Sequence, residues 1–283
     1  MKSPARSRSA YGWVTFGLAL CLTACLWAGR AAADTAPRRI VSLNTCTDQL
    51  LLMLARRERI AALTYLTTRQ EISSLWREAR AIPQVRGSAE EILMLQPDLV
   101  LAGIYTTRYT RKLLKQFGVP VISLPPANNF TDVRRHIRQV AKAIGEEKRG
   151  EALVATFDKD LARLAATRPR SGVFYRNGGY SAGHGTLSDA VMRAANMENA
   201  AAVAGLDGSG FFPLERLVMA RPDWLITSDY KRDVPTIGTR VLRHPALRTL
   251  LGGEFVLPGN LTACGGPWNA RAAELLAGLL AVD

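Results

Sequence analysis

Few side chains in this sequence could act as catalysts or hold a metal. The three histidines, His136, His184 and His244, stand on separate segments, and His184 alone between two glycines is a weak candidate for a general base. The sequence contains no Gly-x-Ser-x-Gly, no phosphate-binding loop, no Gly-x-Gly-x-x-Gly after a strand and no His-Glu-x-x-His. We therefore expect no enzyme, no covalently bound cofactor and no metal site of the protein's own.

The charge balance is basic but carries no pattern typical of nucleic-acid binding. Lys and Arg number 37 against 24 Asp and Glu, which gives a formal net charge of +13. Four of the basic residues lie in the first 33 residues, so the rest of the chain carries +9. There is no long Lys/Arg tract, and aromatic residues are not interleaved with the basic ones. We expect no nucleic-acid partner.

Residues 1–33 have the features of an export signal. A basic start is followed by an uncharged apolar run over 13–27 and by Ala31-Ala32-Ala33, a typical cleavage site. The run is shorter than the roughly twenty residues that span a membrane, so no permanent membrane helix is expected after cleavage. Leu22-Thr23-Ala24-Cys25 resembles a bacterial lipobox, which leaves a lipid anchor at Cys25 as the alternative.

The elements that must position any site alternate between short apolar runs and helical patterns. Strands are predicted at 39–43, 60–63, 98–102, 119–123, 172–175, 223–227 and 254–257. Helices are predicted at 47–55, 89–96, 107–117, 186–195, 214–220 and 270–281. This alternation predicts βαβ units and mostly parallel sheets, hence an α/β fold.

A helical stretch separates two similar halves of the sequence. Residues 131–144 form an amphipathic pattern with Gly145 as its C-cap. A second pattern runs from about 146 to 167 and, at 1.5 Å per residue, spans roughly 30 Å. We predict a signal at 1–33, an N-terminal lobe at 34–130, a helical linker at 131–169 and a C-terminal lobe at 170–283.

Two segments, 90–100 and 215–225, repeat each other across the halves. Each holds a short helix, a Pro-Asp corner and a buried strand, because proline ends the helix. Glu90 and Glu215 stand seven residues before the prolines. Carboxylates stabilise helix N-termini, and a capping box accounts for Glu91. This leaves Glu90 and Glu215 as symmetric carboxylates that we expect to be exposed.

Three features together carry a family resemblance: Arg39-Ile40-Val41-Ser42-Leu43, the paired Glu…Pro-Asp units and the long helix. In these features the sequence resembles the periplasmic cobalamin and ferric-siderophore binding proteins of ATP-driven (ABC) importers. The resemblance covers essentially residues 38–283. It implies a periplasmic monomer whose two Rossmann-like lobes, joined by one long α-helix, enclose a ligand cleft. It also implies a metal complex as cargo, namely a ferric siderophore, haem or cobalamin, and a permease dimer with its ATPase as partners.

The resemblance implies particular roles for residues on this chain. One carboxylate on each lobe would dock onto arginines of the permease, which assigns Glu90 and Glu215. The cleft would lie at the carboxyl ends of the strands. Its candidate residues are Asn44, Cys46, Tyr65, Tyr105, Arg108 and Tyr109 in the first half and Tyr175, Arg176, Asn177, Tyr180, Tyr230 and Trp268 in the second.

Two of the four cysteines, Cys46 and Cys264, lie far apart and outside the signal, so they form no Cys-x-x-Cys motif. By the resemblance both approach the cleft from opposite lobes. Three alternatives stay open: a disulfide across the mouth, a thiolate contact to a bound metal centre, or two unrelated buried cysteines.

The expected function is that of the solute-binding component of an importer. The alternatives are an exported sensory or accessory binding module that does not deliver cargo and, with least support, an exported enzyme on a two-lobe scaffold. Adjacent genes for a permease and an ATPase would favour import.

Overall fold

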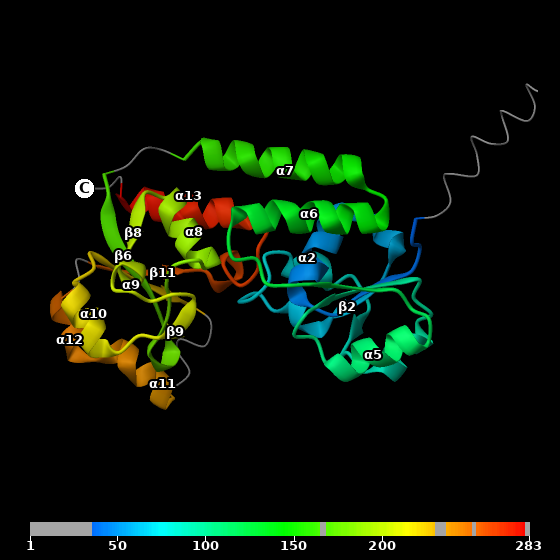
Figure 1. Cartoon of the computed structure of the whole chain (residues 1–283), viewed down its shortest axis with the longest axis horizontal. Coiled ribbons are helices and arrows are strands. Elements are labelled where there is room, and N and C mark those ends of the chain that lie inside the picture. The colour runs from blue at the N-terminus through cyan, green and yellow to red at the C-terminus, as the bar shows by residue number, and fades with distance from the viewer. Residues whose placement is uncertain (1–35, 165–167, 230–235, 251–252, 281–283) are drawn as a thin grey trace, which may run out of the picture. The chain divides into compact units, whose positions relative to one another are not determined.

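The computed structural model describes residues 36–164, 168–229, 236–250 and 253–280 (Figure 1). The predicted signal, the lipobox cysteine Cys25 and the cleft candidate Tyr230 lie outside these residues. Contacts group Pro37–Asp283 into one unit, which contains both sheets. No helix in the described part of the chain is long and apolar enough to span a membrane.

The first lobe, residues 40–124, is built on a parallel sheet with the strand order β3-β2-β1-β4-β5. Its strands are β1 (Ile40–Ser42), β2 (Ile60–Thr64), β3 (Gln84–Val85), β4 (Leu99–Gly103) and β5 (Val121–Leu124). Its α-helices are α2 (Thr45–Leu54), α3 (Trp76–Ala79), α4 (Ala89–Met94) and α5 (Arg108–Gln116), and short 3-10 turns are η1 (Arg57–Arg59) and η2 (Tyr65–Thr68). β1 and β4 are buried throughout, as expected for parallel strands covered on both faces.

The second lobe, residues 170–280, has a mixed sheet with the order β11-β10-β6-β7-β9, and β8 also pairs with β6. Its strands are β6 (Arg170–Arg176), β7 (Tyr180–Ala182), β8 (Met197–Asn199), β9 (Ser209–Phe211), β10 (Trp224–Ser228) and β11 (Gly253–Leu257). Its helices are α8 (Leu187–Ala194), α9 (Ala200–Val203), α10 (Leu214–Ala220), α11 (Ile237–Arg240), α12 (Pro245–Leu250) and α13 (Trp268–Leu280), with 3-10 turns η3 (Asn177–Gly179), η4 (Val241–Arg243) and η5 (Gly259–Leu261).

One edge of β6 has two different neighbours. The first residues of β6 pair in parallel with β8, from Arg170 to Gly172, whereas Tyr175 and Arg176 pair antiparallel with β7. β9 then extends β7, also antiparallel. The carboxyl end of the second sheet therefore carries an antiparallel pair that the first sheet lacks.

The structure has two helices where the linker helices were predicted, and the second is shorter than expected because it ends at Ala162. α6 (Phe130–Ile144) buries Val133, Ile137, Val140 and Ile144 and ends at Gly145, whose φ of 70° is the left-handed conformation of a C-cap. α7 (Glu147–Ala162) lies against α6 and α13 (Figure 1).

Shared packing ties α7 to its surroundings. Its Val154 and Phe157 are buried in the core of the first lobe, and the same cluster includes Ala270 of α13 and Leu187 of α8. Two ion pairs, Arg134–Asp158 and Arg138–Glu151, also join α6 to α7. The long helix is thus a packed element rather than a flexible tether.

Candidate functional site

A cavity of about 640 Å³, within the range of small-molecule sites, is present in the described part of the chain. It lies where the carboxyl ends of β6 and β10 face the segment after η2 of the first lobe. Its lining residues are Glu71, Ile72, Tyr175, Arg176, Asn177, Tyr180, Ser228, Leu242, Gly259, Thr262 and Ala263. The cavity therefore has walls from both lobes.

Four of the predicted cleft residues line this cavity: Tyr175, Arg176, Asn177 and Tyr180. Tyr175 is fully buried and its hydroxyl donates to the Phe212 carbonyl oxygen at 3.1 Å, so it is a fixed wall. Burial, and then the nearby charge of Glu215, raises the pKa of the Tyr175 phenol, which keeps it neutral. Tyr180 is 55% exposed and forms an edge-to-face pair with Phe211, their ring centroids 6.5 Å apart.

Arg176 is the cationic group of the cavity. It is exposed to solvent and has no ion-pair partner among the described residues. Partial desolvation lowers the pKa of its guanidinium, but an arginine starts so high that it stays charged at neutral pH. On the opposite wall Glu71 pairs with Arg69 at 3.1 Å. Two hydrogen bonds hold the pKa of the Glu71 carboxyl below its ordinary value. The larger effect comes from the backbone N–H of Glu71 itself, and the smaller one comes from the Arg69 side chain. Arg176 is thus available to an anionic ligand.

The other predicted cleft residues of the first lobe lie outside the cavity lining. Asn44 caps α2, because its side-chain oxygen accepts from the Cys46 backbone N–H at 3.0 Å. Tyr65 lies under the Arg86 guanidinium, 5.7 Å from the ring centroid. The remaining three, Tyr105, Arg108 and Tyr109, are exposed around the start of α5.

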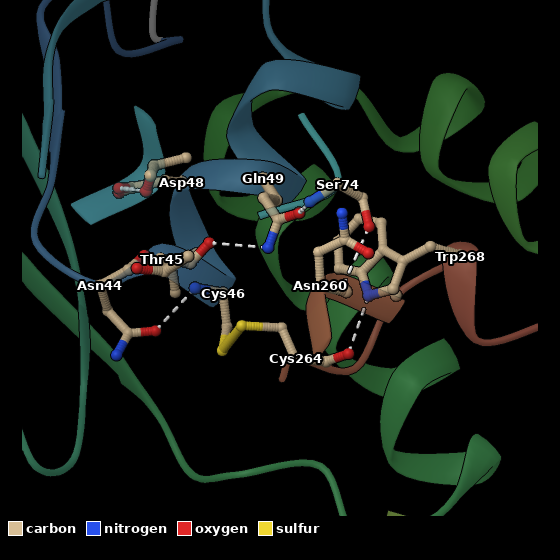
Figure 2. Close-up of a disulfide and its surroundings, with 12 residues drawn as sticks. Asn44, Thr45, Cys46, Asp48, Gln49, Ser74, Asn260, Cys264 and Trp268 are labelled. Atoms are coloured by element: carbon tan, nitrogen blue, oxygen red, sulfur yellow. Dashed lines mark hydrogen bonds between the residues drawn. A yellow bond between two sulfur atoms is a disulfide. The ribbon is translucent and has the colours of Figure 1, made fainter. Parts of the chain in front are cut away.

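The expectation for Trp268 needs correction. It is almost fully buried, and its indole N–H donates to the Cys264 carbonyl oxygen at 2.9 Å (Figure 2). Asn269 donates to the same oxygen at 3.0 Å. Trp268 therefore supports the loop that carries Cys264 and does not line the cavity.

A disulfide joins Cys46 to Cys264, whose Cα atoms lie 5.1 Å apart (Figure 2). Cys46 is in the first turn of α2, and Cys264 follows η5 in the second lobe. Of the three alternatives for these cysteines, the structure has the disulfide, and its place is beside the cavity rather than in its lining.

Hydrogen bonds reinforce this covalent link between the lobes. The Ser74 hydroxyl donates to the Asn260 carbonyl oxygen at 3.0 Å, and the Asn260 amide donates to the Gln70 carbonyl oxygen at 2.9 Å (Figure 2). A Cβ on Gly259 would lie 2.7 Å from the Ser228 hydroxyl oxygen and 2.8 Å from the Glu71 carbonyl oxygen. Only glycine permits this close approach at the cavity wall.

Several lining residues were not predicted from the sequence. Glu71 and Ile72 follow η2 in a segment without strand or helix pattern, and Thr262 and Ala263 follow η5. Ser228 ends β10, so the rule that ligands bind at strand ends could have found it. Glu71 and Ile72 join the lining only through the contact between the lobes.

The repeated Glu…Pro-Asp units have matching structures. In each unit the residue before the proline lies in the left-handed region although it is not glycine, Gln96 with φ 47° and Arg221 with φ 44°. The following aspartate then fixes a neighbouring strand: Asp98 accepts from the Arg39 backbone N–H at 2.9 Å, and Asp223 accepts from that of Ser171 at 2.7 Å. The Pro-Asp corner is therefore structural in both lobes.

The two candidate docking carboxylates remain available on these units. Glu90 and Glu215 are exposed and make no hydrogen bond or ion pair with the described residues. The Ser88 hydroxyl accepts from the Glu91 N–H at 3.2 Å, but Glu91 does not close the predicted capping box. Its carboxylate accepts instead from the backbone N–H groups of Arg86 and Gly87. Because Glu91 is engaged, the structure favours Glu90 as the free carboxylate.

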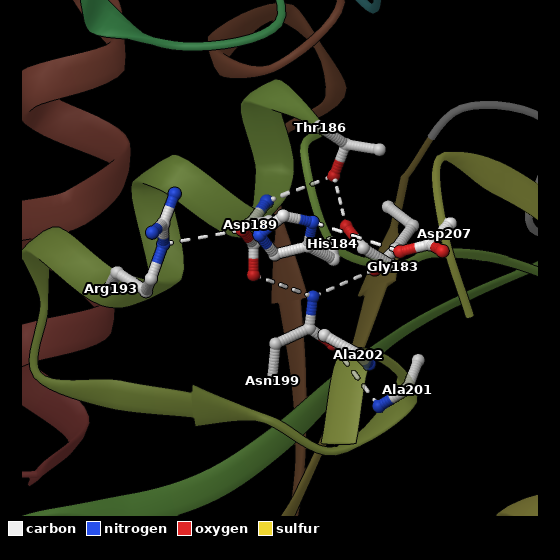
Figure 3. Close-up of polar contacts among 10 residues, drawn as sticks. Gly183, His184, Thr186, Asp189, Arg193, Asn199, Ala201, Ala202 and Asp207 are labelled. Carbon is white, nitrogen blue, oxygen red and sulfur yellow. Dashed lines mark hydrogen bonds and ion pairs between the residues drawn. The ribbon is translucent and has the colours of Figure 1, made fainter. Parts of the chain in front are cut away.

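A polar cluster near His184 has a structural role. Buried Asp189 accepts from the Asn199 amide at 3.1 Å and pairs with Arg193 at 3.2 Å (Figure 3). His184 lies on the surface, 3.7 Å from the exposed Asp207 carboxylate. Among the described residues no group of three or more His, Cys, Asp or Glu could hold a metal ion.

Comparison with known proteins agrees with this architecture. The uncharacterised ABC transporter substrate-binding lipoprotein YvrC of Bacillus subtilis is 24% identical over 208 residues, which are 68% of this chain and 64% of that protein. A cobalamin-binding protein of Halobacterium salinarum is 26% identical over 203 residues, 69% of this chain and 54% of that protein. The chain thus spans less than two thirds of the length of these relatives.

A solved structure shows the same fold over nearly its whole length. The apo form of the periplasmic haem-binding protein RhuT from Roseiflexus sp. RS-1 is 25% identical, with a TM-score of 0.70 over 86% of this chain and 97% of that one. The family model described as periplasmic binding protein matches residues 40–250. Since that match covers most of the sequence, the chain belongs to the periplasmic binding protein family.

Proposed function

We propose that the protein is the substrate-binding component of an ABC importer and that it binds a metal complex in the cavity between its lobes. The single observation that carries this proposal is the cavity itself. It joins Arg176, Asn177 and Tyr180 of the second lobe to Glu71 and Ile72 of the first. The same proposal includes residues 1–33 as a signal peptide for export and the periplasm as the location of the protein.

The chemistry of the cavity favours a bulky, partly apolar anion. Tyr180 offers an aromatic face beside the charge of Arg176, and Ile72 and Leu242 add apolar surface. Ferric siderophores, haem and cobalamin all combine a rigid body with polar or charged edges. The names of the relatives, which include a cobalamin-binding and a haem-binding protein, support the same set of cargoes.

A ligand screen tests this proposal directly. The protein without residues 1–33 is titrated with haemin, cyanocobalamin and ferric hydroxamate, catecholate and carboxylate siderophores, and binding is followed by tryptophan fluorescence and thermal shift. We expect saturable binding of one class. Failure of all of them, with the protein shown to be folded, would contradict the proposal.

Delivery to a permease is the second part of the proposal. The exposed carboxylates Glu90 and Glu215 occupy equivalent sites on the two lobes, so a partner with two equivalent cationic sites would bind both. A dimeric permease has this symmetry. A sensory module that delivers no cargo would not need these carboxylates, so their effect on uptake separates the two functions.

A further inference from the structure

The methionines of this chain fall into two groups. Six are present in the sequence, and five lie in the part of the chain that the structure describes. Met192 and Met197 are buried and Met53 is half-buried. Met94 is 85% exposed and Met219 is 81% exposed. A single exposed apolar residue needs no explanation, but these two occupy the same position of the repeated unit.

Each exposed methionine lies on the same helix face as a docking carboxylate. Met94 follows Glu90 by four residues on α4, and Met219 follows Glu215 by four residues on α10. Residues four apart on a helix are neighbours on its surface. The face toward the core is held by Ile92 in one helix and Leu217 in the other, both buried. Each lobe therefore presents one carboxylate–methionine pair outward.

The helices that carry these pairs are firmly held. In the first lobe the Arg39 guanidinium donates to the Leu95 carbonyl oxygen, at 2.6 Å from Nη2, at the end of α4. In the second lobe the Arg216 guanidinium donates to the Ala204 carbonyl oxygen and lies over the Phe212 ring. These contacts thus anchor both helices, while the carboxylate–methionine pairs themselves stay free for a partner.

An exposed methionine is a typical residue of a protein interface. Methionine is enriched at interfaces, and its flexible, polarisable side chain adapts to sockets of irregular shape. Met219 lines a groove together with the apolar residues Ala200, Val203, Ala204 and Ala220 and the polar residues Ser171, Glu198 and Arg216. The duplication of the pair points to a partner with two equivalent sites.

We propose that Met94 and Met219 insert into two equivalent apolar sockets of the importer's permease dimer, each next to the cation that receives Glu90 or Glu215. This inference rests on the proposed function and adds an apolar contact to its electrostatic one. The carboxylates would speed encounter and fix the register, whereas the methionines would slow dissociation.

The test measures binding to a defined partner. The partner is the permease–ATPase complex of the same organism, identified because its deletion abolishes uptake of the bound ligand. This complex is purified in lipid nanodiscs. Association and dissociation of the ligand-loaded protein are then followed by biolayer interferometry at several salt concentrations. We expect Met94→Ala with Met219→Ala to raise the dissociation rate about tenfold or more, with unchanged salt dependence of association. Phe117→Ala with Ile237→Ala removes one exposed apolar side chain per lobe outside the repeat and should change neither rate.

The outcomes separate this inference from the proposed function. If Glu90→Gln with Glu215→Gln weakens binding while the methionine variant binds like the wild type, docking stands and the methionine sockets are refuted. If neither double variant changes binding, the docking surface itself is wrong. Sedimentation of the free protein provides a further check: a dimer that only the methionine variant abolishes would make the occupant a second copy of the chain and overturn the proposal.

Discussion

The two sheets differ in strand direction. The sheet of the first lobe is parallel, whereas the sheet of the second lobe also contains β7 and β9, which pair antiparallel at the carboxyl end of β6. This pair places Tyr180 and Phe211 beside Arg176 at the carboxyl end of β6. The first lobe contributes only Glu71 and Ile72 to the same cavity. By contrast, the Glu…Pro-Asp units are closely alike in the two lobes. The lobes thus differ where the ligand would bind and agree where the permease would bind.

The largest expected effect concerns the shared unit. Glu90→Gln together with Glu215→Gln removes both carboxylates without changing side-chain size, and we expect uptake of the ligand to fall to background while ligand affinity stays unchanged. Uptake of labelled ligand by cells that carry only the variant measures this.

Two exposed carboxylates outside the units provide the control for that experiment. Glu58→Gln with Glu147→Gln should leave uptake intact. Normal uptake by the Glu90/Glu215 variant would show that the likeness of the two units serves folding alone.

A pair of arginines compares the ligand walls of the two lobes. Arg176 lines the cavity at the end of β6, and Arg108 is exposed at the start of α5. Because a charge-assisted hydrogen bond contributes about 1.5–3 kcal/mol, Arg176→Ala should weaken binding of an anionic ligand roughly 10- to 100-fold. Arg108→Ala should change the Kd less than twofold in the same fluorescence titration. The reverse order of effects would move the ligand to the first lobe.

Removal of the disulfide tests the link between the lobes. Cys46→Ser with Cys264→Ser should lower the free energy of unfolding by about 2–5 kcal/mol, because the bond closes a very long loop. For a protein of this size the melting temperature should fall by about 5–15 °C. Calorimetry of both proteins, with intact mass under non-reducing conditions, provides the measurement. Two free thiols in the wild type would disprove the bond.

The last expected effect is a change of stability with pH, and it concerns the first lobe. Burial raises the pKa of Asp48 from 3.8 to about 8, although its carboxylate accepts from the Thr64 backbone N–H at 3.0 Å. The folded state therefore holds a proton that the unfolded chain releases above about pH 4. This contribution to stability is full below the unfolded pKa and is lost as the pH rises through 8.

Asp48→Asn should flatten the decline of stability between pH 5 and pH 9. Denaturant unfolding at several pH values checks this. Buried His136, whose pKa is lowered mainly by burial, acts in the opposite sense, because its neutral form is favoured and stability falls as the solution becomes acidic. An equally steep decline in the Asp48 variant would assign the dependence to another group.

The sequence predicted the apolar strands, including the three-residue β1, and it missed the short strands β3, β7, β8 and β9. Runs such as 98–102 and 223–227 are apolar enough to identify β4 and β10. β7 and β9 have three residues each and lie among glycines, which indicate turns when the sequence is considered alone. Their pairing depends on β6, so no local pattern reveals it.

The sequence indicates the part of the cavity lining that comes from the second lobe better than the part that comes from the first. Arg176 ends the long strand β6, and Asn177 and Tyr180 follow it closely, so the strand-end rule finds them. Glu71 reaches the cavity only because the lobes approach each other at Gly259. An aromatic residue after a glycine-rich loop can either face a ligand or pack beneath the loop, and the sequence does not distinguish the two. In Trp268 the indole N–H donates to the Cys264 carbonyl oxygen and so supports the loop from within.

The central claim is that a metal complex binds between the lobes, against the wall built by the second. Hydrogen–deuterium exchange with mass spectrometry, with and without the ligand class found in the screen, tests it most directly. We predict protection of segments 175–180 and 259–263 together with 71–72, and no change at 104–109. Protection confined to 104–109, or no protection on either wall of the cavity at saturation, would contradict it.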